Sequence, residues 1–166
     1  MGCDIHVSLE RKVSRISGEG FEWRCVTLFE VPPEKALTET KLSGHDYYRV
    51  ESRNYDFFAA LAGVRGNTVD KREPKGLPDD LSLEVAWRCA YWDSDGHSFS
   101  WDYADDFCSM FFKHCLNGEE QRELAEEIMT GDEAIESWKK VMNLYLWRVS
   151  DDAKSSDYRF VYFFDN

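Results

Sequence analysis

The chain has 166 residues, of which 43% are hydrophobic and 15% aromatic. This composition predicts a single domain over residues 1–166 with its own core, and excludes a mainly disordered protein. The net charge is −12 at pH 7, and residues 79–136 hold 16 acidic residues against three basic ones. A basic surface is needed to bind phosphates, so free nucleic acid is excluded as a partner of this acidic region.

No apolar run approaches the length needed to span a bilayer, so we expect no membrane partner. The N-terminus has neither a basic segment nor a long apolar segment, and we therefore expect no secretory signal. Five cysteines without C-x-x-C spacing indicate reduced thiols in a cytoplasmic protein. A role for Cys3 as a ligand or nucleophile is the alternative.

The first elements predict a hairpin. Apolar and polar residues alternate over 3–10, which is typical of a half-buried strand. A glycine-containing turn at 17–20 and an apolar stretch at 21–29 predict the second strand. Pro32 and Pro33 end it, because neither residue can donate to a strand ladder.

The middle of the chain is mainly helical. Caps and apolar spacing predict helices at 55–62, from 80 or 82 to about 89, and at 103–116, 119–129 and 132–148. Residues 67–78 and 92–101 are expected to be loops, the latter with a short strand at its end as an option. An aromatic strand is expected at 158–164.

Strands at both ends with helices between them indicate an α+β fold. We expect a small antiparallel sheet, formed by the N-terminal hairpin and the C-terminal strand. Four to five helices should cover one face of that sheet.

The loop at 92–101 is the strongest candidate site, because it places Asp95, His97 and three serine hydroxyls between two tryptophans. One interpretation is a degenerate calcium loop that ends at Asp102. Another uses His97, Ser98 and Ser100 only as hydrogen-bonding groups, with Trp101 stacking on a ring. A hydrogen-bonded turn between core tryptophans is the structural alternative.

A third interpretation joins this loop to the N-terminal strand. Asp4 and His6 project from one face of that strand, because alternate residues share a face. With Asp95 and His97 they form a ligand set suited to a divalent metal such as Zn, Mn, Fe or Mg. His6 and His97 would then be the catalytic residues of a metal-assisted hydrolysis.

Arg53, Asn54 and Tyr55 stand at the start of the helix predicted at 55–62. Backbone N–H groups at a helix start attract anions, and Arg53 can grip a phosphate with two hydrogen bonds. These residues, with Ser98 and Trp101, are therefore the expected ligand-binding residues. Simple capping of the helix by Asn54 is the alternative.

Several motifs are spread over almost the whole chain: Met-Gly-Cys-Asp-Ile-His at 1–6, Arg-Asn-Tyr-Asp at 53–56, Leu-Ala-Gly-Val-Arg at 61–65, Gly-Leu-Pro at 76–78, Asp-Gly-His-Ser-x-Ser-Trp at 95–101 and Phe-Asp-Asn at 164–166. In these motifs the chain resembles a family of small, mostly uncharacterised bacteriophage and prophage proteins. The resemblance implies a bacterial host cytoplasm and an accessory role, with action against host defence as one such role. After Trp101 the acidic stretch at 102–106 departs from the family pattern.

Two functions follow from these expectations. The first is an accessory protein whose polar pocket binds a small phosphorylated, nucleotide-like ligand and hydrolyses it if a metal is present. The second is a non-catalytic acidic inhibitor that imitates nucleic acid and blocks a basic surface of a host or defence protein.

Overall fold

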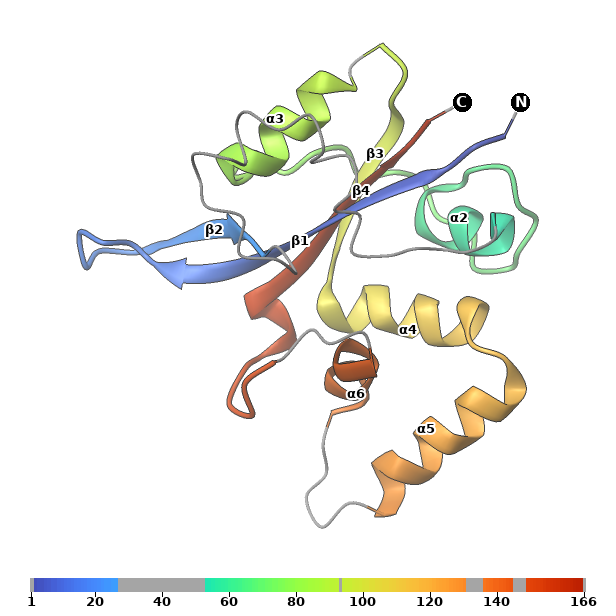
Figure 1. Ribbon diagram of the computed structural model, residues 1–166. Helices are drawn as coiled ribbons and strands as arrows, with labels where there is room; N and C mark the ends of the chain where they lie inside the picture. The colour runs from blue at the N-terminus through green and yellow to red at the C-terminus, as the bar shows by residue number, and fades with distance from the viewer. Residues whose placement is uncertain (1, 27–52, 93, 131–135, 145–148, 166) are drawn as a thin grey trace.

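The computed structural model describes residues 2–26, 53–92, 94–130, 136–144 and 149–165 (Figure 1). Four strands form one antiparallel sheet in the order β2-β1-β4-β3. The strands are β1 (Ile5–Ser14), β2 (Phe21–Cys25), β3 (His97–Tyr103) and β4 (Tyr158–Phe164). The helices are α2 (Tyr55–Ala62), α3 (Leu83–Tyr91), α4 (Ala104–Cys115), α5 (Gly118–Thr130) and α6 (Ser137–Leu144), with a short 3-10 turn at Ser155–Asp157.

The predicted α+β class, the hairpin and the pairing of the first and last strands are confirmed. The loop expected at 92–101 is shorter than predicted, because β3 begins at His97 and pairs with β4 along the edge of the sheet. The end of the predicted strand at 21–29 and both ends of the predicted helix at 132–148 lie outside the described residues.

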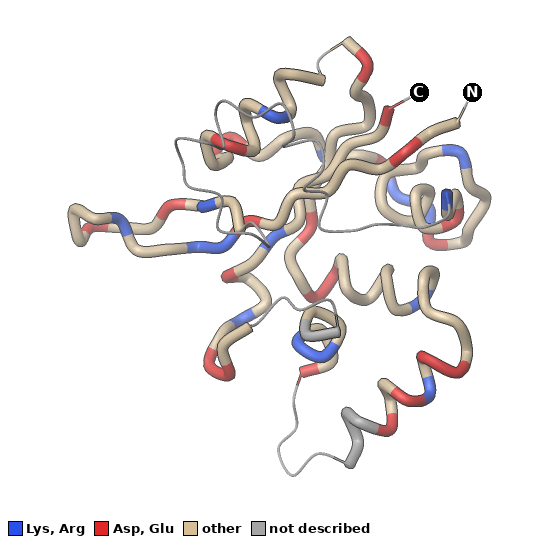
Figure 2. Tube along the Cα trace, viewed as in Figure 1, with Lys and Arg blue, Asp and Glu red and all other residues tan. Residues whose placement is uncertain are grey.

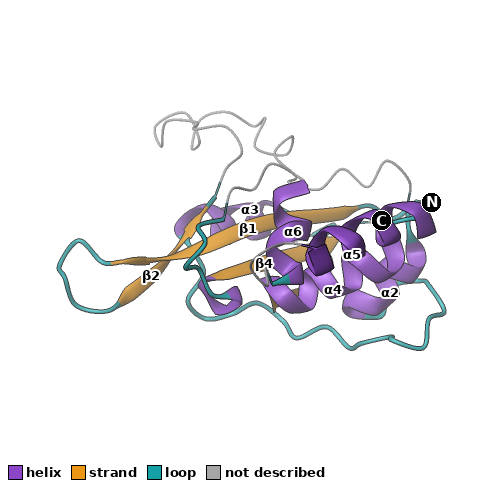
Figure 3. Ribbon diagram, turned by 90° about the horizontal axis from the view of Figure 1, so that it is seen from below, coloured by secondary structure: helices purple, strands orange, loops and turns teal. Residues whose placement is uncertain are grey.

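Both faces of the sheet are covered, which corrects the expectation of helices on one face. The larger core packs the odd-numbered side of β1 against α2, α4 and α6, with Phe160, Tyr162 and Phe164 from β4. A smaller cluster packs Val161 and Phe163 against α3. Figure 3 shows the helices of the larger core gathered over the sheet. We call these two sides the α4 face and the α3 face.

The polar residues of β1 explain why the α3 face is covered as well. His6, Ser8 and Glu10 point to the α3 face and are only 8%, 4% and 0% exposed. Alternation of apolar and polar residues usually marks a solvated second face. Here the polar side is buried because each of these side chains has a partner from a distant part of the chain.

Candidate functional site

Four polar residues meet where the two ends of the chain lie side by side (Figure 1). Asp4 directly precedes β1, His6 lies near its start, Asp165 follows β4, and Arg53 precedes α2. We call these four residues the terminal cluster. Antiparallel pairing of β1 with β4 brings Asp4 and His6 close to Asp165.

Hydrogen bonds within the terminal cluster join its members directly. Arg53 grips Asp4 with two hydrogen bonds, from Nε at 2.8 Å and from Nη2 at 3.2 Å. These bonds lower the pKa of the Asp4 carboxyl and raise that of Arg53. A Cβ atom at Gly2 would overlap the Arg53 guanidinium, so the glycine leaves room for this ion pair. Asp165 accepts a hydrogen bond from the Asp4 backbone N–H at 2.9 Å.

His6 is enclosed by aromatic rings. Its ring stacks on Phe163 at 4.8 Å and lies 4.5 Å from Trp92, measured between ring centroids. Its Nε2 lies 3.0 Å from a carboxylate oxygen of Asp165. Burial lowers the pKa of His6, and the hydrogen bond with Asp165 acts in the opposite direction. A neutral imidazole held by a carboxylate has the orientation of a general base, but here the ring is packed into the α3 face.

His97 lies on the other face of the sheet. It pairs with Phe164, whereas His6 pairs with Phe163, and neighbouring residues of β4 point to opposite faces. Its Nδ1 lies 3.0 Å from the Ser98 hydroxyl, and its Nε2 is buried without a hydrogen-bond partner among the described residues. Ser98 has a φ of 53° within an irregularity of β3, a conformation that is uncommon for residues other than glycine.

The proposed ligand set therefore does not converge around one point. His6 and His97 are separated by the sheet, Asp95 is exposed, and Asp4 is held by Arg53. Among the described residues, no group of three or more His, Cys, Asp or Glu side chains is placed to hold a metal ion. A two-histidine metal centre would need these segments to rearrange.

The other expected ligand-binding residues also have partners within the chain. Asn54 accepts a hydrogen bond from the Phe57 backbone N–H at 3.0 Å and so caps α2. Tyr55 packs edge-on against Phe58. Trp101 lies on the α3 face, where the Lys75 ammonium sits 5.1 Å from its ring centroid.

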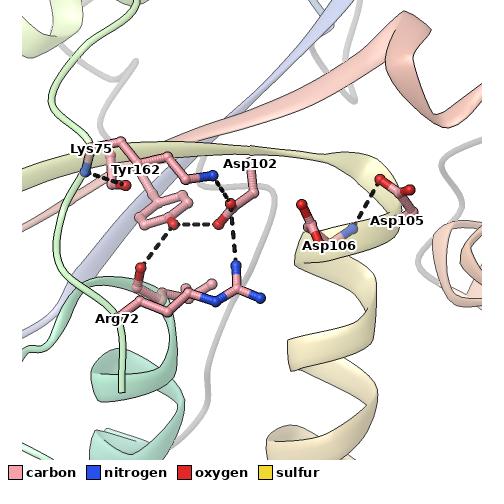
Figure 4. A network of polar contacts seen from close by, with 8 residues as sticks. Arg72, Lys75, Asp102, Asp105, Asp106 and Tyr162 are labelled. Carbon is pink, nitrogen blue, oxygen red and sulfur yellow. Dashed lines mark hydrogen bonds and ion pairs between the residues drawn. The ribbon is translucent and has the colours of Figure 1, made fainter. Parts of the chain in front are cut away.

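A buried carboxylate forms a second polar centre, which the sequence did not reveal (Figure 4). Asp102 has no solvent exposure and points to the α4 face. It accepts hydrogen bonds from the Tyr162 hydroxyl at 2.6 Å, from Arg72 at 3.3 Å and from Lys75. The burial of Tyr162 and the carboxylate beside it raise the pKa of this phenol. This network fastens the loop at 67–78 to the sheet.

The same network overturns the calcium interpretation. The calcium interpretation gave Asp102 the last ligand position of the loop. In the structure Asp102 lies inside β3 and accepts hydrogen bonds from Tyr162, Arg72 and Lys75. A calcium loop needs its last carboxylate directed at the ion.

A third polar centre lies on the α3 face. Glu10, which is fully buried, accepts a hydrogen bond from Arg159 at 2.5 Å and another from the Ser82 backbone N–H at 2.7 Å. Arg159 also donates to Asp80 at 2.6 Å and lies over the Trp23 ring. These contacts join β1, β4 and the start of α3, and are structural ties rather than an open site.

The cysteines, all five of them described, form no disulfide, as the sequence predicted. Burial raises the pKa of Cys3. A nucleophile is usually activated by a lowered pKa, so this environment does not favour the alternative role of Cys3. Cys3 also belongs to the core of the α4 face, away from His6.

Acidic residues recur along α5 (Figure 2). Glu119, Glu120, Glu123 and Glu126 are exposed, whereas Leu124 is buried at 4% exposure. No Lys or Arg of the described ranges forms an ion pair with Glu119 or Glu123. We call these four glutamates the acidic face.

Comparison of the chain with family models, with curated proteins and with solved structures finds no match. Within the described ranges, no helix has the length and apolar character needed to cross a membrane.

Proposed function

We propose that the chain is a non-catalytic binding protein whose acidic face docks on a basic surface of a protein partner. The observation that carries this proposal is the arrangement of carboxylates on α5. Glu119, Glu123 and Glu126 follow at i, i+4 and i+7, a spacing that aligns side chains along one side of a helix. The opposite side of α5 packs through Leu124 into the core.

The spacing of these charges is of the same order as that of a nucleic acid strand. Residues 119–126 rise by about 10 Å along the helix, so Glu119, Glu123 and Glu126 place one carboxylate about every 5 Å along this side. One strand of DNA carries a charge about every 3.4 Å along its axis. A basic groove that binds nucleic acid is therefore the partner surface with matching charge.

The contacts within the terminal cluster support binding rather than catalysis. Arg53 is held by Asp4, and the His6 ring is packed between Trp92 and Phe163. The acidic face, in contrast, is already directed at solvent and needs no rearrangement before it meets a partner. The resemblance to phage proteins adds a setting in which that partner is a host or defence protein.

The test uses a lysine-rich peptide as a defined basic probe. We expect its affinity, measured by fluorescence anisotropy, to fall by about tenfold or more between low and physiological salt. The triple variant Glu119→Gln, Glu123→Gln, Glu126→Gln should bind at least about tenfold more weakly at low salt. Glu120 is left in place because it accepts a hydrogen bond from the Asn117 backbone N–H.

A matched control removes three exposed carboxylates elsewhere, through Glu19→Gln, Glu73→Gln and Asp79→Asn. This variant has the same net charge as the triple α5 variant. If the two variants lose affinity equally, net charge rather than the acidic face governs binding, and the proposal fails.

The nucleotide-binding pocket is a second candidate, because the terminal cluster does bring polar side chains from three segments together. Calorimetry against a nucleotide panel tests it. A phosphorylated ligand gripped by Arg53 should lose affinity in Arg53→Ala and in His6→Ala, while the triple α5 variant should bind normally. Unchanged affinity in Arg53→Ala and His6→Ala would reject this candidate.

A further inference from the structure

The two edges of the sheet differ in how they are protected. Beside β3, the Gly76 backbone N–H donates to the Phe99 carbonyl at 2.9 Å, and the Lys75 N–H donates to the Ser100 hydroxyl. β2 is the opposite edge strand. Among the described residues, no backbone hydrogen bond reaches its outer side. An unprotected edge is a template for pairing with another strand.

Hydrogen-bonded pairs alternate along the β1–β2 hairpin, and this alternation shows which backbone groups of β2 point away from β1. The Val26 N–H donates to the Leu9 carbonyl and the Arg15 N–H donates to the Gly20 carbonyl. Hydrogen-bonded pairs alternate along an antiparallel ladder, so Glu22 and Arg24 direct their backbone groups toward β1 in this register. The N–H and C=O groups of the residues between and beside them therefore face away from β1; these residues are Phe21, Trp23 and Cys25.

We propose that two copies of the chain pair through their β2 strands, antiparallel and centred on Trp23, to form one continuous sheet. In this register Trp23 faces Trp23 of the second copy, and Phe21 faces Cys25. All three residues have outward backbone groups, so every one of these groups finds a partner. The symmetry is that of a two-fold dimer, in which both copies use the same surface.

The charges of β2 select this register. Within one copy, Arg24 forms an ion pair with Glu22, with Nη2 2.6 Å from Oε1. Centring on Trp23 places this pair beside the same pair of the second copy, with Glu22 opposite Arg24 twice over, at the closely spaced positions between hydrogen-bonded pairs. A register centred on Glu22 would place Glu22 opposite Glu22 of the second copy. A register centred on Arg24 would place Arg24 opposite Arg24 of the second copy. Opposite charges across strands stabilise pairing and like charges oppose it.

Apolar surface beside the edge would be covered by the second copy. Phe21 is 60% exposed and Leu83, at the start of α3, is 75% exposed. Both line a cleft of about 400 Å³ between the hairpin and α3, together with Trp23, Leu81 and polar residues that include Lys12, Arg15 and Glu84. A continuous sheet puts the α3 faces of both copies on the same side, so the two clefts would lie next to each other across the β2–β2 junction.

Sedimentation velocity of the full chain over a range of concentrations tests the pairing. The wild type should form a dimer that dissociates on dilution. Glu22→Arg and Arg24→Glu should each weaken the dimer at least about tenfold, because each creates two like-charge pairs. An equimolar mixture of the two variants should restore it, as should the double variant. Restoration also shows that the single variants are folded.

A cross-link tests the register. Phe21→Cys should form a disulfide with the native Cys25 of the second copy under an oxidant, because hydrogen-bonded pairs place Cα atoms about 5.5 Å apart, within reach of a disulfide. Adding Cys25→Ser should abolish this product. A wild type that is monomeric at every concentration overturns the proposal. So does a dimer that neither charge variant weakens, or one that forms no cross-link.

Discussion

Asp102 is a carboxylate without solvent exposure that depends on hydrogen bonds from Tyr162, Arg72 and Lys75. Removing one partner from a buried polar group leaves the others uncompensated. We expect Asp102→Ala to lower the free energy of unfolding by about 3 kcal/mol and Tyr162→Phe by about 1 kcal/mol, measured by urea denaturation. Asp106→Ala, an exposed control, should change it by less than about 0.5 kcal/mol. Equal effects at Asp102 and Asp106 would contradict the buried network.

His6 gives the protein a pH dependence. Burial lowers its pKa in the folded state, so around the ordinary histidine pKa of about 6.5 the unfolded chain binds more protons than the folded one. Stability should therefore fall as the pH drops through that value. The decrease in Tm from about pH 7.5 to about pH 5.5 should be smaller in His6→Gln than in the wild type. His114→Gln serves as the control. If Tm falls as the pH drops in His6→Gln by as much as it does in the wild type, His6 is not the source of the pH dependence.

The sequence placed Asp4 and His6 on a strand and Arg53 at a helix start. The structure has His6 on β1 and Arg53 just before α2, whereas Asp4 directly precedes the strand. Their partners could not be predicted, because Asp165 lies 159 residues from His6 and Arg53 lies 49 residues from Asp4. Long-range pairing of this kind leaves no local pattern. The Phe-Asp-Asn motif at 164–166 includes Asp165 but indicated no role for that residue.

At the scale of elements, α2 shows how a capping residue can resemble a ligand-binding one. Asn54 caps the helix through its Oδ1, and its Nδ2 donates to the His114 carbonyl at 2.7 Å. Asn54→Ala should cost about 1 kcal/mol of unfolding free energy. Asn54→Asp keeps the cap and loses the hydrogen bond to the His114 carbonyl, so the unfolding free energy should fall by less than in Asn54→Ala. Chemical denaturation that shows no loss in Asn54→Ala would contradict the capping role.

Helix positions were predicted well from caps and spacing, because those signals are local. The predicted helix at 103–116 corresponds to α4, and Ser82 does cap α3. β3 was predicted less well. Its inward-facing positions include Ser100 and Asp102, both fully buried, and polar residues at these positions hide the alternation that marks a strand.

At the scale of the whole molecule, the sheet is buried on both sides and its polar centres act as ties. Glu10, Asp102 and Asp165 each hold together segments that are distant in the sequence. The acidic face on α5 is instead a set of exposed carboxylates. Pairing through β2 would leave it accessible in both copies, since β2 and α5 lie at different ends of the structure (Figure 1).

The most direct test of the proposed function is an NMR titration of the labelled chain with the lysine-rich peptide. If the acidic face is the docking surface, the largest amide shift changes should fall on α5, around residues 119–126, and should disappear at high salt. Shift changes centred instead on Asp4, His6, Arg53 and His97 would contradict the account.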